Sequence, residues 1–230
     1  MTCPSALRHL LIAFITLTIS ARSSAQVLEQ GFTTGIHVGV TQAFTDVTDS
    51  DINPSFGALA QYNITPFTFG NVEYSIGRLS RKELDIYGKR FTNNFHRVTA
   101  TANVSLGQLL NPDYRVAHYL LYNVYVGSGI GMIYSNISEP NALTSDGFGG
   151  ITYKGADLAI PVNVGFNFKI GGYLYPDSPM NFTVNLQHNF GLTEMLDGYD
   201  PDNSDNQTKD SFTVLNVGMK YSFGKKKGLY

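Results

Sequence analysis

The sequence predicts an all-β fold, an eight-stranded antiparallel up-and-down transmembrane β-barrel. One observation is that residues 158–170 alternate strictly between apolar residues and polar or small ones, and a period of two is typical of a strand. A second is that this segment, at about 3.3 Å per residue and a tilt of about 45°, is long enough to cross the hydrocarbon core of a bilayer. A third is that seven further segments alternate in the same way, giving the even strand number of such barrels.

Segment 158–170 shows the pattern most clearly. Its even positions, from Leu158 to Ile170, are all apolar, whereas its odd positions include Asn163 and Lys169. We therefore expect one face to meet lipid and the other to face the lumen. Pro161 lacks a backbone donor, so we expect it at a rim or a bulge.

The other segments justify the remaining strands. The eight predicted strands, in chain order, are residues 34–44, 55–64, 71–79, 95–106, 119–134, 158–170, 181–192 and 212–223. Turn-forming or charged stretches separate them, and no segment has the pattern of a long amphipathic helix.

Residues 1–25 have the pattern of a secretory signal peptide. Arg8 and His9 precede an apolar core at residues 10–19, and small residues end at Ala25. Residues 26–230 are then one outer-membrane β-barrel domain with a short basic C-terminal tail. Cys3 would leave with the signal, so the mature chain would contain no cysteine.

Composition excludes two classes of protein. The chain has 230 residues, 43% of them hydrophobic, with a formal charge of -2, which becomes -4 when the two arginines of the signal are removed. This charge is too weak and too mixed to predict nucleic-acid binding. A mean hydropathy of -0.08, with no later apolar run near twenty residues, excludes a helical membrane protein.

The connections differ between the two ends of the predicted barrel. Those at residues 45–54, 80–94, 135–157 and 193–211 are longer and more charged than those at 65–70, 107–118 and 171–180. Long extracellular loops and short periplasmic turns are typical of these barrels, so we expect both termini in the periplasm. Aromatic girdles at the strand ends are expected from Tyr62, Tyr74, Tyr122, Tyr134, Phe168 and Tyr221.

The signal peptide, the eight amphipathic strands and the final VLNVGMKYSFG together resemble the small OmpA/OmpX-like outer-membrane β-barrel proteins of Gram-negative bacteria. The resemblance covers essentially the whole mature chain and implies a location in the cell outer membrane, contact with its lipid and insertion by the barrel-assembly machinery. In that family an aromatic residue at the end of the closing strand resembles the assembly signal. Tyr221 and Phe223 would fill that role, although the tail at residues 224–230 places the terminal residue beyond the strand.

Strand parity predicts five charged or titratable side chains in the lumen. These are His37, Glu73, Arg97, Lys169 and Lys220. Because buried charges need partners, we expect Glu73 to pair with Lys220 or Lys169, with Arg97 nearer the outer end. The network would fill the lumen, or alternatively gate a narrow pore.

Metal, cofactor and catalytic sites are not expected. The acidic loop holds Asp197, Asp200, Asp202, Asp205 and Asp210, and this density of oxygens could bind Ca²⁺. Its spacing does not match an EF-hand, so a solvated loop without metal is the expectation. The run of glycines at residues 127–131 lacks the third glycine of a dinucleotide loop, and we interpret it as small inward residues that make room for large ones.

Histidines near the outer rim are the remaining candidates for catalysis. His188 and His96 lie high on strands, but parity points both toward lipid, and Phe190 occupies the place next to His188 where a serine would be needed. The sequence thus predicts a non-enzymatic integral outer-membrane barrel, with a structural, adhesive or narrow-channel role carried by its extracellular loops. Loop partners are not identified.

Two alternatives remain open. One is an outer-membrane barrel enzyme that acts on lipid or peptide. The other is a soluble exported, lipocalin-like carrier of an apolar ligand, which requires the even-numbered residues to face inward.

Overall fold

The structure is a computed structural model, and it describes residues 31–45, 50–65, 67–84, 90–108, 123–138, 152–169, 179–192, 196–197 and 209–223. The predicted signal peptide and the basic tail lie outside these residues. None of the helices among the described residues is long and apolar enough to cross a membrane.

Eight strands account for nearly all of the described chain. They are β1 (Phe32–Phe44), β2 (Asn53–Asn63), β3 (Thr68–Arg81), β4 (Phe91–Ser105), β5 (Val124–Ser138), β6 (Lys154–Lys169), β7 (Met180–Gly191) and β8 (Ser211–Phe223). One turn of 3-10 helix, η2 (Leu106–Gln108), follows β4.

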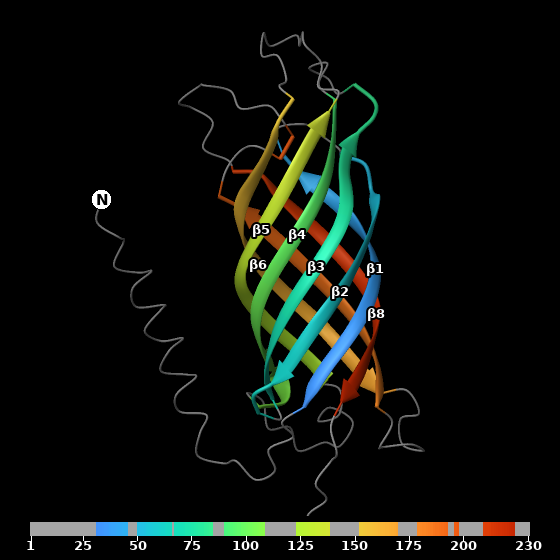
Figure 1. The fold of residues 1–230 in the computed structure, drawn as a ribbon, viewed down its shortest axis with the longest axis vertical. Coiled ribbons are helices and arrows are strands. Elements are labelled where there is room, and N and C mark those ends of the chain that lie inside the picture. The colour runs from blue at the N-terminus through green and yellow to red at the C-terminus, as the bar shows by residue number, and fades with distance from the viewer. Residues whose placement is uncertain are drawn as a thin grey trace, which may run out of the picture.

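The strands close into a single antiparallel barrel in chain order, with β8 hydrogen-bonded to β1 (Figure 1). The predicted up-and-down fold is confirmed. Backbone pairing followed around the barrel from Phe32 returns to the same strand at Gln42. This stagger means that the strands are tilted against the barrel axis. We call the end where β1 begins and β8 ends the terminal end, and the opposite end the loop end.

Strand positions agree with the sequence prediction, but several limits differ. The fourth strand begins at Phe91 instead of residue 95, the fifth extends to Ser138 instead of residue 134, and the sixth begins at Lys154 instead of residue 158. Each extension carries the hydrogen-bonded ladder into polar sequence at the loop end. The alternation of apolar and polar residues stops where this polar sequence begins, whereas the backbone hydrogen bonds between strands continue through it.

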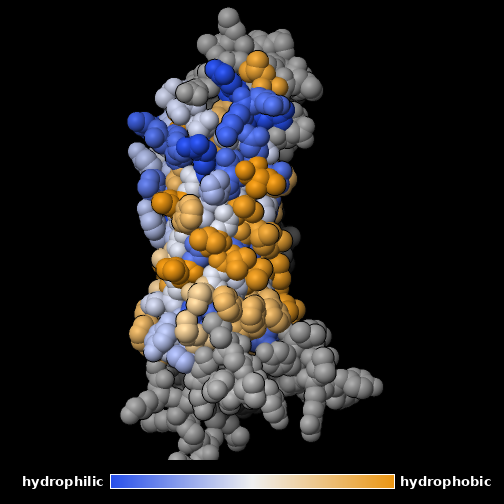
Figure 2. Space-filling model, turned by 90° about the vertical axis from the view of Figure 1, so that its right-hand side faces the viewer, coloured by the Kyte–Doolittle hydropathy of each residue, from blue (hydrophilic) through white to orange (hydrophobic). Residues whose placement is uncertain are grey.

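Side-chain parity gives the barrel an apolar outside and a polar inside. Ile36 and Ile130 are 71% and 73% exposed, and apolar side chains project outward from all eight strands as one apolar belt. On the face drawn in Figure 2 the belt lies below a hydrophilic band at the loop end. The even-numbered residues of β6 point outward, contrary to the requirement of a carrier with an apolar ligand inside.

Pro161 was expected at a rim or a bulge, and the structure does not place it at a rim. It lies in the middle of β6, buried, and pairs with Asn189 of β7. On its other side the backbone pairing between β5 and β6 passes from Ser128 directly to Gly131. Proline cannot donate to a neighbouring strand, so the ladder is interrupted here, and Ser128 Oγ donates to the Pro161 carbonyl at 2.9 Å.

Candidate functional site: the barrel interior

A buried ion pair occupies the middle of the interior. Arg97 of β4 projects inward and is 1% exposed, and its Nη2 contacts Oε1 of Glu73 on β3. Arg97 Nε also donates to Ser75 Oγ at 3.0 Å. Because Ser75 is the register partner of Arg97, the guanidinium reaches along β3 toward the terminal end to meet the carboxylate. The pair places a charge and its counter-charge together where water is largely excluded.

His37 of β1 is the second neighbour of the Glu73 carboxylate. Its Nε2 lies 3.8 Å from Glu73 Oε1 and has no hydrogen-bond partner among the described residues. The ring fits because glycines face it on both sides: Gly57 pairs with it across β2 and Gly218 across β8. A Cβ at Gly57 would lie 2.6 Å from His37 Cε1, and one at Gly218 would lie 2.8 Å from His37 Cβ.

Lys220 of β8 lies closer to the terminal end. Its Nζ donates to Gln61 Oε1 at 3.1 Å and to Asn167 Oδ1 at 3.0 Å. The ammonium also lies 5.6 Å from the centre of the Tyr125 ring, a distance at which an aromatic face attracts a cation. Amide oxygens and aromatic rings therefore solvate this lysine.

The charge pairing in the interior differs from the one expected from strand position. The expectation was that Glu73 would pair with Lys220 or Lys169, but its ion-pair partners in the described chain are Arg97 and His37. Strand parity correctly predicted that both residues point into the lumen. Arg97 was expected nearer the outer end than Glu73, but its side chain is long enough to reach the carboxylate. The backbone of Lys169 pairs with Asn181, and its side chain lies outside the described atoms.

Large inward side chains face glycines across the ladder throughout the interior. The pairs, in addition to those of His37, are Phe95–Gly77, Asn103–Gly127, Tyr125–Gly165, Asn216–Gly39 and Lys220–Gly35. In each pair a Cβ on the glycine would come into close contact with the larger side chain. An eight-stranded barrel has room only for its own side chains, and glycine is where that room is made. In the glycine run of β5, Gly127 has this explanation, whereas a Cβ at Gly129 would meet the backbone of Ala100 on β4.

An apolar plug fills the interior at the loop end. Its residues are Ala43, Leu79, Phe91, Phe95, Ile133, Leu196, Phe212 and Val214. Seven of them come from the loop-end parts of strands, and Leu196 comes from the connection between β7 and β8. The Arg97 guanidinium lies 5.8 Å from the Phe212 ring centre, so the plug directly covers the ion pair.

Hydrogen bonds hold Leu196 in the plug. Asn93 Nδ2 donates to the Leu196 carbonyl at 2.8 Å, and the Leu196 N–H donates to Asp210 Oδ2 at 2.8 Å. The fully buried side chain of Asn93 also donates to Ser135 Oγ. Leu196, a loop residue, is thus held at the mouth by hydrogen bonds with two side chains, those of Asn93 and Asp210.

Tyr153 and Asp157 lie beside this mouth, at the start of β6. The Tyr153 hydroxyl donates to Asp157 Oδ1 at 3.4 Å. Loss of solvent contact, followed by the neighbouring Asp157 carboxylate, raises the pKa of the Tyr153 phenol. The raised pKa extends to higher pH the range in which the phenol is protonated and can donate to the carboxylate.

The histidines considered as catalytic candidates both project outward. His188 Nδ1 lies 2.8 Å from Thr213 Oγ1, and the ring contacts Phe44 and Phe190. His96 Nδ1 lies 2.8 Å from the Tyr74 hydroxyl. Each histidine thus has one hydroxyl partner in the apolar belt.

The acidic loop is only partly described. Asp197 is fully buried and Asp210 is 3% exposed, whereas Asp200, Asp202 and Asp205 lie outside the described residues. Within the described parts of the chain, no three His, Cys, Asp or Glu residues are grouped as metal ligands would be. Asp210 serves as the acceptor for the Leu196 backbone.

Aromatic side chains gather on the outside of the terminal end. Tyr221 and Phe223 project outward at the end of β8, and their rings meet edge to face with centres 4.8 Å apart. Phe32 lies 6.4 Å from Phe223 across the β1–β8 contact. Among the predicted girdle residues, Tyr62 and Tyr134 also project outward, whereas Tyr122 lies outside the described residues.

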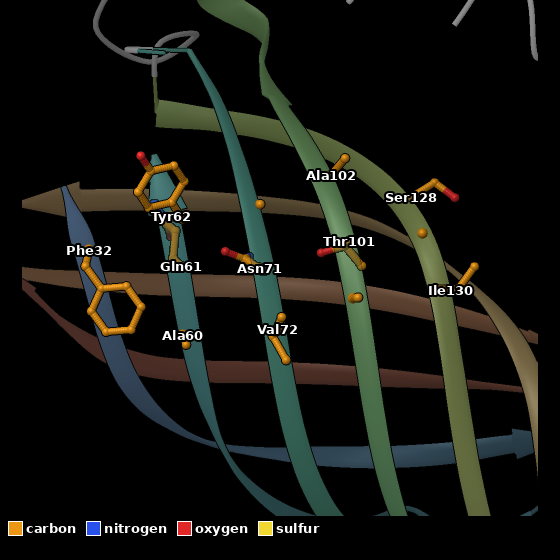
Figure 3. A pocket seen from close by; sticks show the side chains of 13 residues that line it. Phe32, Ala60, Gln61, Tyr62, Asn71, Val72, Thr101, Ala102, Ser128 and Ile130 are labelled. Carbon is orange, nitrogen blue, oxygen red and sulfur yellow. The ribbon is translucent and has the colours of Figure 1, made fainter. Parts of the chain in front are cut away.

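A shallow groove runs over the outer surface from β1 to β5 (Figure 3). Phe32 and Tyr62 stand on one side and Ile130 on the other, over the small residues Ala60 and Ala102. The groove is part of the apolar belt, and its lining includes Ser128, whose hydroxyl donates to the Pro161 carbonyl.

The plug is the feature that sequence reasoning missed. Its signal was present, because Phe95, Ile133 and Phe212 are apolar residues at inward positions. They lie near the loops, where apolar residues occupy inward as well as outward positions, so the alternation does not single them out. Leu196 carried no such signal, since it belongs to no strand.

Comparison with known proteins gives a likeness of fold. No protein-family model matches the chain, and no curated protein matches it. Neisserial surface protein A is 13% identical, over 84% of this chain and 97% of that one, with a TM-score of 0.47. Ail of Yersinia pestis is 11% identical, over 85% and 100%, with a TM-score of 0.45. CarO of Acinetobacter baumannii is 13% identical, over 87% and 100%, with a TM-score of 0.44.

Proposed function

We propose that this chain is an integral outer-membrane β-barrel protein with a closed lumen, which serves as a non-enzymatic anchor for its loops. The observation that carries the proposal is the apolar belt around a closed barrel whose interior is polar. In water such a belt would expose apolar surface on every strand, far more than soluble monomers expose. In a bilayer the same belt is solvated by lipid, and the closed ladder leaves no unpaired strand edge.

The closed lumen favours the anchoring role over the channel role. The plug fills the loop end, and the Glu73–Arg97 pair lies directly beneath it. Ions passing through would have to displace packed apolar side chains and separate a buried ion pair. The loops and the outer surface are then the parts available for structural or adhesive contacts.

We further propose that the terminal end faces the periplasm. The connection between β2 and β3 at the terminal end is a tight turn, in which Ile64 and Thr65 donate to the Thr68 carbonyl. Short turns lie on the periplasmic side of such barrels. Tyr221 and Phe223 would then stand at the periplasmic boundary, where the barrel-assembly machinery would meet the closing strand.

Electrophoresis of protein extracted from membranes tests the proposal. A folded barrel resists detergent until it is boiled, so we expect the unboiled and boiled samples to migrate differently, and we expect detergent to be needed for extraction. Release of native protein into detergent-free buffer would overturn the membrane assignment. Protease added to intact cells tests the orientation, because only the loop end should then be cut.

The enzymatic alternative is distinguished by a separate measurement. An enzyme acting on lipid or peptide at the rim would depend on His188, which has Thr213 as its hydroxyl partner. Membranes containing the protein or its His188→Ala variant should show the same lipid and peptide composition. A product that is lost in the variant, while heat-modifiable migration is kept, would establish catalysis.

A further inference from the structure

A row of four polar side chains crosses the outer surface at the loop end. Backbone pairing places Arg78 of β3 beside Asn94 of β4, Asn94 beside Asn136 of β5, and Asn136 beside Lys154 of β6. All four occupy outward positions, and all except the partly exposed Asn136 are exposed. We call this set the polar row.

The polar row marks the upper limit of the apolar belt on this side of the barrel. The outward residues one step closer to the middle are Ile76, His96, Tyr134 and Ala156, and those of the following step are Tyr74, Val98, Met132 and Leu158. Aliphatic and aromatic side chains therefore lie directly beneath the polar row. In a membrane this is the level at which hydrocarbon gives way to headgroups.

The geometry of the polar row suits an extended ligand. Neighbouring strands lie about 4.8 Å apart, so the backbones of Arg78 and Lys154 at its ends are separated by about 14 Å along the surface. Because the strands are tilted by about 45°, the row also rises by about 10 Å from Arg78 to Lys154. It thus passes obliquely from the edge of the hydrocarbon core through the headgroup region, which is about 5–8 Å deep in each leaflet.

The chemistry of the polar row suits phosphate and sugar groups. Arg78 Nε donates to Asn94 Oδ1 at 3.0 Å, which holds the guanidinium in the row, and arginine has four further N–H donors. Guanidinium and ammonium groups bind phosphate strongly. The two amides between them can both donate to and accept from hydroxyl or amide groups.

The electrostatic surroundings favour an anion. Three basic residues, Arg81, Lys82 and Arg90, lie at the loop end of the same two strands, β3 and β4. The described carboxylates in this region are those of Asp51 and Glu83. One Asp51 oxygen accepts from the backbone N–H of Lys82 at 3.0 Å. The described charges on this side are therefore predominantly positive.

We propose that the polar row is a binding surface for a bis-phosphorylated glycolipid headgroup of the outer leaflet. Arg78 and Lys154 each bind one phosphate, and Asn94 and Asn136 bind the sugar between them. The inference rests on the proposed function, because only a barrel inserted in a membrane with its loop end outward presents the row to that leaflet.

Titration of the full chain in neutral detergent micelles tests the proposal. The probe is fluorescently labelled lipid A, a disaccharide lipid with two phosphates, and binding is followed by fluorescence anisotropy. Near a membrane surface each basic residue contributes about a fivefold change in anion affinity. We therefore expect Arg78→Ala/Lys154→Ala to weaken binding about 25-fold. Lys209→Ala removes an exposed cation before β8 and should change the affinity less than twofold.

Further measurements separate the possible failures. Unchanged affinity in the double variant, with heat-modifiable migration retained, would overturn the inference and leave the proposed function intact. Equal binding of a monophosphorylated lipid A would overturn the assignment to two phosphates. Failure of the unaltered chain to enter vesicles would instead overturn the proposed function. Binding should also weaken as salt is raised from about 0.05 M to about 0.5 M, since exposed charges are screened.

Discussion

Glu73 and Arg97 form a buried ion pair between neighbouring strands, although they are not register partners. Glu73 pairs with Thr99 along the β3–β4 ladder, and Arg97 pairs with Ser75. The arginine side chain crosses this offset, donates to Ser75 on the way and ends at the carboxylate. The pair thus ties β3 to β4 through side chains as well as backbone.

Removing the carboxylate should destabilise the barrel strongly. Glu73→Gln leaves the Arg97 guanidinium buried without a counter-charge, and losing one partner of a buried pair costs about 3–5 kcal/mol. Urea unfolding in lipid vesicles measures this as a lower free energy of unfolding. The double variant Glu73→Gln/Arg97→Met removes both charges and should recover most of the loss. A single variant as stable as the unaltered protein would contradict the importance of the pair.

Gly57 should be intolerant of a side chain because of His37. A Cβ on Gly57 would meet the His37 ring, and forcing extra atoms into a packed interior costs about 1–3 kcal/mol. We expect Gly57→Ala to lower the free energy of unfolding by this amount. His37→Ala should recover only part of the loss in the double variant, because the new Cβ would also lie 2.6 Å from the Tyr74 carbonyl oxygen. Gly70→Ala is the matched control, since the nearest atom to its Cβ is 4.0 Å away. Equal effects at the two glycines would contradict this explanation.

The sequence was sufficient to predict the closed barrel and the face of each residue. The side-chain period of a strand is two, so once the direction of one side chain is known, the direction of every other side chain in that strand follows. For this reason His37, Glu73, Arg97 and Lys220 could be assigned to the interior, and the structure buries all four.

The pairing of these residues could not be predicted in the same way. Which inward groups meet depends on the stagger between strands and on side-chain reach, and neither is encoded in alternation. Arg97 was therefore placed too far from Glu73. The polar row was missed for a related reason, because Arg78 and Lys154 become parts of one surface only when the register is known.

A charge in the middle of the apolar belt should be costly only in a membrane. Ile130 is 73% exposed in the middle part of β5, and an arginine at the bilayer midplane of a barrel costs about 2–4 kcal/mol. We expect Ile130→Arg to lower the free energy of unfolding in vesicles by that amount. Ile52→Arg is the control, because Ile52 is 68% exposed but precedes β2 at the loop end, where the cost should be below about 1 kcal/mol. Equal stability of the two variants would contradict immersion of the belt in lipid.

The apolar plug should keep the barrel from conducting ions. In planar bilayers the unaltered protein should show no porin-like conductance steps, because packed side chains occupy the loop end. Phe95 and Phe212 lie in the plug with ring centres 5.7 Å apart, and truncating each to alanine removes about 3–5 kcal/mol of stability while opening space beside Arg97. We expect Phe95→Ala/Phe212→Ala to conduct in small steps if the barrel remains heat-modifiable. Phe190→Ala shortens an outward phenylalanine and should leave the barrel closed. Porin-like steps in the unaltered protein would show that the plug is not a seal.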